Sequence, residues 1–346
     1  MNITIMVPSL IVGGVSTTFH ELHRGLTREG FDIKLLKIGG PKSPFLSGYY
    51  CDLLQTKILM DSDLVLYIGG IPWPSHIIAR SKGIPVALFL HGYVYHELSQ
   101  IILHEKGLRK KIGSAIILTM LRTAVLCNTI NLYICRSQTV GEMNKISNFV
   151  ILPQWKYPED FEFSRYRGIR WKGAIRIVTY TSIVESPRLL SYRSLSKLVH
   201  VIEHLVRRQF EFVIIDPKER FFHTSSVKTI KPLPRKNFLS FLASSDLYLE
   251  RNIDEELGHT ALEAMCLGVP VAKLTHPRYC DRQDYGDENL ILARSFRELS
   301  EKIAEYINNV EHYYDHYSVH GRKFIETKRT WNAVKGPFLT TLRHLN

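Results

Sequence analysis

The sequence predicts an α/β fold made of two consecutive domains, each built around a parallel sheet. Short apolar runs alternate with segments of helical spacing, which is the pattern of strand–helix–strand units. The pattern stops at residues 157–173 and then starts again. The 346 residues also suit two domains, at about 150 residues each.

The first half begins with the apolar run Asn2 to Pro8, a glycine pair and a helical segment over 16–27. Phe19, Leu22 and Leu26 share one face of that helix, and a serine or threonine at its start can cap it. This is the opening of a parallel sheet. Strands are expected at 2–8, 32–38, 64–68, 85–90, 131–135 and 150–153, with a second helix at 75–82.

The segment 157–173 is rich in charged and aromatic residues and has no regular period, so it is the expected linker. We expect domains at 1–165 and 172–327, followed by a C-terminal helix at about 328–346. The second domain should contain strands at 174–180, 210–215, 227–230, 246–250 and 269–274, and helices at 195–208, 235–243, 258–267 and from 297.

Composition excludes several classes of protein. An apolar fraction of 45% and a charged fraction of 23% are ordinary for a folded chain and argue against disorder or a multi-span membrane protein. Five scattered cysteines without a C-x-x-C pair give no zinc signature and fit a reducing compartment. The N-terminus does not resemble a secretory signal, so a cytoplasmic location is expected.

The net charge of +12 permits three kinds of partner: nucleic acid, an anionic membrane surface or a phosphorylated substrate. One basic cluster precedes an apolar run, which is typical of a helix that lies on an anionic membrane and equally of a core helix with a solvated start. The apolar stretch 112–134 contains Arg122 and Asn128, so we expect a helix and a strand there rather than a membrane span. The cluster consists of Lys106, Arg109, Lys110 and Lys111.

The segment 246–274 carries the most chemistry. A strand ends near Glu250, an acidic loop with Glu255 follows, and Gly258 allows a tight turn into a helix that contains Glu263. Free amides at a helix N-terminus bind a diphosphate, and carboxylates accept hydrogen bonds from sugar and ribose hydroxyls. The alternative is a solvated loop acid and a helix acid that merely complements the helix dipole.

From Glu255 to Val271 the pattern E-E-L-G-x-x-x-L-E-A-M-x-x-G-V-P-V resembles the E-x7-E signature of the retaining glycosyltransferase family 4. The resemblance implies the GT-B fold, two Rossmann-like domains that face a central cleft. It implies transfer of a hexose from a nucleotide sugar with retention, without a catalytic metal or a cofactor. The first domain would bind the acceptor and the second the donor, and the terminal helix near Trp331 would pack back on the first domain.

The same resemblance assigns roles to single residues. Glu255 would hold the hydroxyls of the donor sugar and Glu263 the ribose, while a cation and the start of the helix would take the diphosphate. The acceptor side would supply a histidine and a glycine pair. The candidate catalytic residues are therefore His91 and Glu255, and the candidate donor-binding residues are Gly13, Gly14, Arg188, Gly258, His259, Thr260 and Glu263.

Two departures from the signature leave other functions open. The usual Gly-Arg after the strand at 174–180 is missing, so Arg188, with Arg193 in reserve, is the expected diphosphate cation. Glu256 replaces the common glycine. The alternatives are a non-catalytic GT-B-like protein that binds nucleic acid or another partner through its basic surface, a nucleotide-sugar epimerase, or a transferase with DNA as its acceptor. His312, His316 and His320 recur every four residues, which fits a surface helix better than a metal site.

Overall fold

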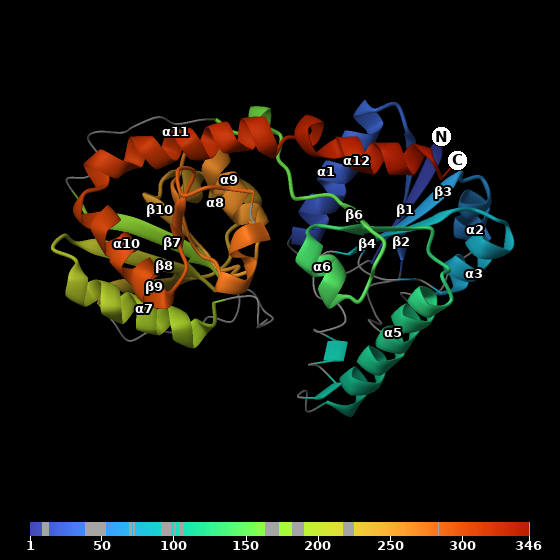
Figure 1. Cartoon of the computed structure of the whole chain (residues 1–346), viewed down its shortest axis with the longest axis horizontal. Coiled ribbons are helices and arrows are strands. Elements are labelled where there is room, and N and C mark those ends of the chain that lie inside the picture. The colour runs from blue at the N-terminus through green and yellow to red at the C-terminus, as the bar shows by residue number, and fades with distance from the viewer. Residues whose placement is uncertain are drawn as a thin grey trace. The chain divides into compact units, whose positions relative to one another are not determined.

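A computed structural model describes residues 1–8, 14–38, 53–68, 71, 73–90, 98–99, 102–103, 107–162, 173–181, 190–216, 225–282 and 284–345. The chain divides into two compact units (Figure 1). The first comprises Met1–Pro153 together with Val334–Asn346, and the second comprises Gln154–Ala333. The first unit ends before the boundary predicted at 165, because Lys156 already pairs with Thr330 of the second unit.

The first unit contains a six-stranded parallel sheet of order β2-β1-β3-β4-β5-β6. Every residue of β3 and β4 is buried, as expected for parallel strands covered on both faces. The strands are β1 (Asn2–Pro8), β2 (Asp32–Ile38), β3 (Leu64–Ile68), β4 (Val86–Leu90), β5 (Leu132–Cys135) and β6 (Val150–Ile151). The helices are α1 (Gly14–Arg28), α2 (Leu53–Met60), α3 (Trp73–Ser81), α5 (Leu108–Leu126) and α6 (Gln138–Met143).

The second unit repeats the architecture with a parallel sheet of order β12-β11-β10-β7-β8-β9. Its strands are β7 (Ile175–Tyr180), β8 (Phe210–Ile215), β9 (Val227–Ile230), β10 (Leu247–Glu250), β11 (Val271–Leu274) and β12 (Ile291–Ala293). Its helices are α7 (Tyr192–Leu205), α8 (Arg235–Ala243), α9 (His259–Cys266), α10 (Phe296–Asn308) and α11 (Val310–Lys328). The last helix, α12 (Trp331–Arg343), leads into the first unit, to which its residues from Val334 belong.

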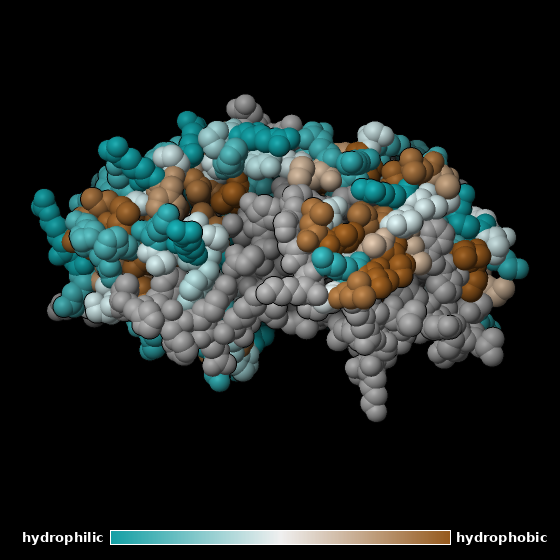
Figure 2. Space-filling model, turned by 90° about the horizontal axis from the view of Figure 1, so that it is seen from below, coloured by the Kyte–Doolittle hydropathy of each residue, from teal (hydrophilic) through white to brown (hydrophobic). Residues whose placement is uncertain are grey.

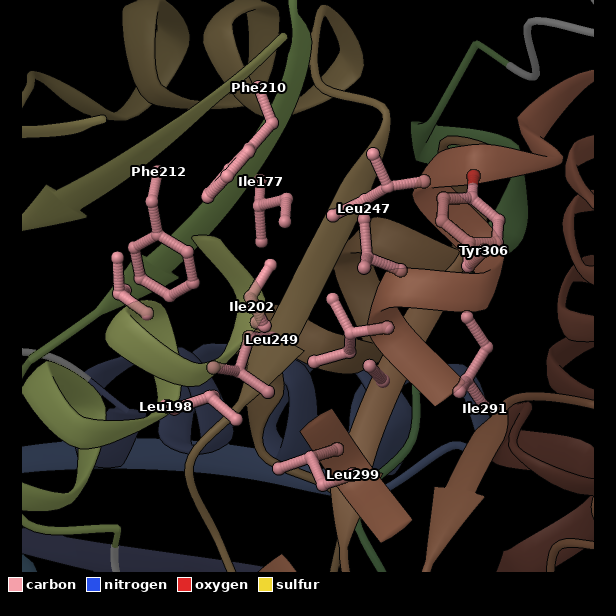
Figure 3. Packing of buried hydrophobic residues seen from close by; sticks show 14 of the residues in the cluster. Ile177, Leu198, Ile202, Phe210, Phe212, Leu247, Leu249, Ile291, Leu299 and Tyr306 are labelled. Carbon is pink, nitrogen blue, oxygen red and sulfur yellow. The ribbon is translucent and has the colours of Figure 1, made fainter. Parts of the chain in front are cut away.

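Successive side chains along the strands of the second sheet point to opposite faces and pack into two hydrophobic cores. Phe212 of β8 and Leu247 of β10 pack with residues of α7 and α10 on one face, as Figure 3 shows. Val213 and Tyr248, one position along in each strand, pack with residues of α8 and α9 on the other face. This period of two places α9 and the loop before it over a well-packed sheet.

The strands and most helices lie where the sequence predicts them, but α2, α6 and β12 were not predicted. Apolar residues occupy most positions of α2, so its sequence shows no helical period. Helix α6 and strand β12 are too short for their sequences to show a helical or a strand period. Among the described residues, no helix combines the length and the apolar character needed to cross a bilayer.

The core of the second unit generates a stability prediction. The buried hydroxyl of Tyr306 donates a hydrogen bond to the backbone oxygen of Asp246 at 2.7 Å. Tyr306→Phe should lower the free energy of unfolding by about 1–3 kcal/mol, because a buried acceptor loses its donor. Tyr313→Phe removes an exposed hydroxyl that donates to Glu305 and should cost under about 0.5 kcal/mol. Equal losses in urea unfolding of the two variants would contradict the prediction.

Candidate functional site

The loop that follows β10 is held at both ends by one buried carboxylate. Glu250 accepts a hydrogen bond from the backbone N–H of Asn252 at 2.8 Å and another from that of Gly258 at 3.0 Å. A Cβ atom at position 258 would lie 2.7 Å from Oε2 of Glu250. Gly258 is therefore needed for this close approach and not for an unusual backbone angle, since its φ is −67°.

Residues 252–257, which we call the acidic loop, carry Asp254, Glu255 and Glu256, and all three acids are buried. Asp254 accepts a hydrogen bond from the N–H of Glu256 at 3.1 Å and so fixes the turn of the loop. Lys273 of β11 is fully buried, and its ammonium group donates to the backbone oxygen of Asn252. Burial lowers the pKa of Lys273, against the opposing effect of Asp254, Glu250, Glu256 and Glu255.

Glu263 lies in α9 and is clamped by two cations. Arg235, at the start of α8, donates two hydrogen bonds to its carboxylate at 2.7 and 2.8 Å. The ammonium group of Lys156 lies 3.1 Å from Oε1 of the same carboxylate. Burial alone would raise the pKa of Glu263, but Lys156 and Arg235 outweigh it and hold the pKa below its usual value. The carboxylate is thus kept ionised as an acceptor.

The start of α9 lies beside Lys156. Nζ of Lys156 is 2.9 Å from Nδ1 of His259, the first residue of the helix. An ammonium group has only donors, so this ring nitrogen acts as the acceptor. The N-cap Gly258 contributes no side-chain cap to the first-turn amides. A helix N-terminus with an adjacent buried lysine favours an anionic ligand.

The structure brings together one part of the predicted site. Glu255, Gly258 and Glu263 lie within a single loop and helix, with His259 and Thr260 in the first turn between them. Gly13, His91, Lys106 and Arg188 lie outside the described residues. Gly14 is the first residue of α1 in the first unit, and Arg193 is exposed in the first turn of α7.

Four residues of the site were missed from the sequence: Lys156, Arg235, Glu250 and Lys273. Two of them carried a signal, because an acid or a lysine at a buried strand position is rare unless it is paired. Glu250 ends the apolar strand β10, and Lys273 interrupts the apolar strand β11. Lys156 and Arg235 had no such signal, since each meets Glu263 only through the fold.

Metal-binding geometry is not seen in the described part of the chain, where no group of three or more His, Cys, Asp or Glu side chains is placed to hold an ion. His312, His316 and His320 all lie on α11. The rings of His316 and His320 stack at 4.3 Å between centroids. Burial and the neighbouring His320 lower the pKa of His316, while Glu288 opposes them.

Comparisons with known proteins place the chain by its fold. Neither a scan against protein-family models nor a search of curated proteins found a match. Solved structures do match over the whole chain. Sucrose-phosphate synthase from Thermosynechococcus elongatus superimposes with a TM-score of 0.63 at 11% identity, covering 99% of this chain and 98% of its own.

Two further structures match equally well. A glycosyltransferase from Rickettsia africae gives a TM-score of 0.65 at 14% identity, with 99% of this chain and 98% of that chain covered. HepE from Anabaena, solved in complex with UDP-glucose, gives 0.66 at 13% identity, with 99% and 100% covered. Two six-stranded parallel sheets and this full-length similarity give the chain the GT-B fold, with two Rossmann-like units.

Proposed function

We propose that this protein is a glycosyltransferase that moves a hexose from a nucleoside-diphosphate sugar to an acceptor. The observation that carries the proposal is the buried, ionised Glu263 beside the N-terminus of α9. The proposal is also supported by the fold, which the chain shares with glycosyltransferases, one of which was solved with UDP-glucose. The E-x7-E pattern of Glu255 and Glu263 supports the same assignment.

In this proposal Glu263 binds the ribose of the donor. An ionised carboxylate has about four acceptor positions, and Arg235 and Lys156 occupy up to three of them. The side chain of Arg235 is 53% exposed, so it can turn aside and open a second position for the ribose hydroxyls. Lys156 is buried and would stay, keeping the carboxylate ionised.

The diphosphate would bind at the first turn of α9, to the amides of His259 and Thr260. The amide of Gly258, also expected there from the sequence, already donates to Glu250. Positive charge there stabilises the leaving group as the bond to the sugar breaks. Arg188 remains the proposed side-chain cation for this task. No catalytic metal or cofactor is part of the proposal.

The sugar would lie against the acidic loop, where Glu255 accepts hydrogen bonds from its hydroxyls. We propose transfer with retention: the bond from C1 to the diphosphate oxygen breaks, and the acceptor oxygen bonds to C1 on the same face. The acceptor proton passes to the departing phosphate oxygen, and no protein nucleophile is involved. His91 and the Gly13–Gly14 pair are the proposed acceptor-side residues.

A donor screen tests the proposal. Thermal unfolding is followed with UDP, GDP, ADP and their sugar conjugates on the wild type, Glu263→Gln and the control Glu211→Gln, which alters an ion pair with Arg176. A nucleotide at a hundred times its Kd should add about 2.7 kcal/mol to the wild type and the control. Glu263→Gln should weaken binding about tenfold or more, because a charge-assisted acceptor is lost.

The relevant readout is the rise in melting temperature that each ligand causes in each protein. Glu263→Gln also removes the counter-charge of buried Lys156, so the variant without ligand should already melt earlier. A wild type that responds to no nucleotide would contradict the proposal and favour the non-catalytic alternative, with nucleic-acid binding as the next assay. An equal response of the wild type and Glu263→Gln would contradict the role of Glu263.

Helix α5 supports a further proposal, that the protein contacts an anionic membrane while it acts. Leu108, Ile112 and Ile116 recur every four residues and are 71%, 52% and 48% exposed. Lys111 lies between them, and the sequence places Arg109 and Lys110 in the same turn. Figure 2, seen from the side on which α5 lies in Figure 1, shows apolar patches among polar areas. An apolar stripe beside basic residues suits an anionic lipid surface.

Vesicle sedimentation tests the membrane contact. Vesicles with anionic lipid should bind the wild type, and Ile112→Ser with Ile116→Ser should reduce binding by about tenfold or more, because two apolar side chains lose their burial in lipid. Ile77→Ser in α3 is the control, since Ile77 is also exposed, at 60%. Equal binding of the three proteins, or equal binding to zwitterionic vesicles, would refute the contact.

A further inference from the structure

Lys273 is a buried cation placed beside the acidic loop by the register of the sheet. In the ladder of β10 and β11 it lies opposite Glu250, the residue that holds both ends of the loop. Its ammonium group reaches past the strand end and donates to the backbone oxygen of Asn252. Lys273 therefore contacts the loop at its first residue and has no exposed surface of its own.

The charge around Lys273 is strongly negative. Glu250, Asp254, Glu255 and Glu256 are all buried, and each acts electrostatically on the ammonium group. The neighbouring Arg251 donates from its guanidinium to the backbone oxygen of Leu190. Four buried carboxylates need compensating charge or hydrogen bonds, and Lys273 supplies positive charge beside them.

One of these acids departs from the pattern that the sequence resembles. Glu256 stands at the position where the E-x7-E pattern has glycine, directly after Glu255. An additional buried carboxylate at that point repels its neighbours unless a cation lies close by. A lysine inside an apolar, buried strand is equally unusual. Glu256 is one of the acids that act electrostatically on Lys273, so both exceptions belong to one charged cluster.

We propose that Lys273 is a positioning residue that fixes the acidic loop and balances its buried acids, so that Glu255 meets the donor sugar in place. The inference rests on the proposed function and deepens it, because it assigns part of the recognition of the sugar to a residue that does not touch the sugar. Nζ of Lys273 is bound to the loop backbone and buried, so its effect passes through the loop. Glu263 and the start of α9, which serve the nucleotide, lie after the loop.

The experiment is isothermal titration calorimetry of the full chain with UDP and with UDP-glucose. The variants are Lys273→Met, Glu256→Gln and the double variant of both. Lys302→Met is the matched control, because Lys302 also donates to a strand carbonyl, that of Leu292, from a half-buried position. For each variant the Kd of both ligands is compared with that of the wild type.

Lys273→Met should leave the Kd of UDP within about threefold of the wild type and weaken UDP-glucose about tenfold or more, since hydrogen bonds from the sugar to a charged acceptor are lost. The double variant should regain most of the affinity for UDP-glucose, because one acid is removed together with its compensating cation. The control should bind both ligands like the wild type. A lysine that serves only packing would not be rescued by Glu256→Gln.

Three results would overturn the inference. The first is a Lys273→Met variant that binds both ligands like the wild type. The second is an equal loss for UDP and UDP-glucose without recovery in the double variant. The third result applies if Lys273→Met does not fold, and it is a double variant that does not fold either. A double variant that folds would instead support the inference. A wild type that binds none of UDP, GDP, ADP and their sugar conjugates refutes the proposed function itself, and so is distinguished from the other three.

Discussion

The bridge from Glu250 to the two ends of the acidic loop is the constraint on which the rest of the site depends. One carboxylate at the end of β10 accepts the N–H groups of Asn252 and Gly258, and so sets both the length of the loop and the start of α9. The position of α9 then decides where Glu263 lies, and so where it meets the side chains of Lys156 and Arg235. Packing of Leu249 and Tyr248 on opposite faces of the sheet makes the end of β10 a rigid base for this chain of contacts.

Much of the architecture could be predicted because it follows from local patterns. Parallel strands buried on both faces are continuous apolar runs, so β3, β7 and β8 are visible in the sequence. The spacing of Glu255 and Glu263 is also visible because it is local: only a loop and one turn of helix separate the two residues. Lys156 was not visible, because its partner lies more than a hundred residues further along the chain and only the fold brings them together.

The identities of 11–14% to structures that match over the whole chain separate two levels of constraint. The sheets tolerate almost any apolar residue of suitable volume, so the fold persists while the sequence drifts. The polar site is less tolerant, because each buried charge needs a specific partner. The loop of this chain, where buried acids lie beside the buried Lys273 that binds the loop backbone, is one place where buried charges need such partners.

The path of the chain has a consequence for its synthesis. The second unit is one continuous stretch, whereas the first is completed only by Val334–Asn346, where Phe338 and Leu342 are buried and Lys335 pairs with Glu29. A ribosome that adds about 5–20 residues per second needs on the order of 10–40 s to pass the intervening stretch. During that time the first unit lacks its last helix and exposes the apolar surface that Phe338 and Leu342 later cover. That apolar surface is open to aggregation until the last helix has been made.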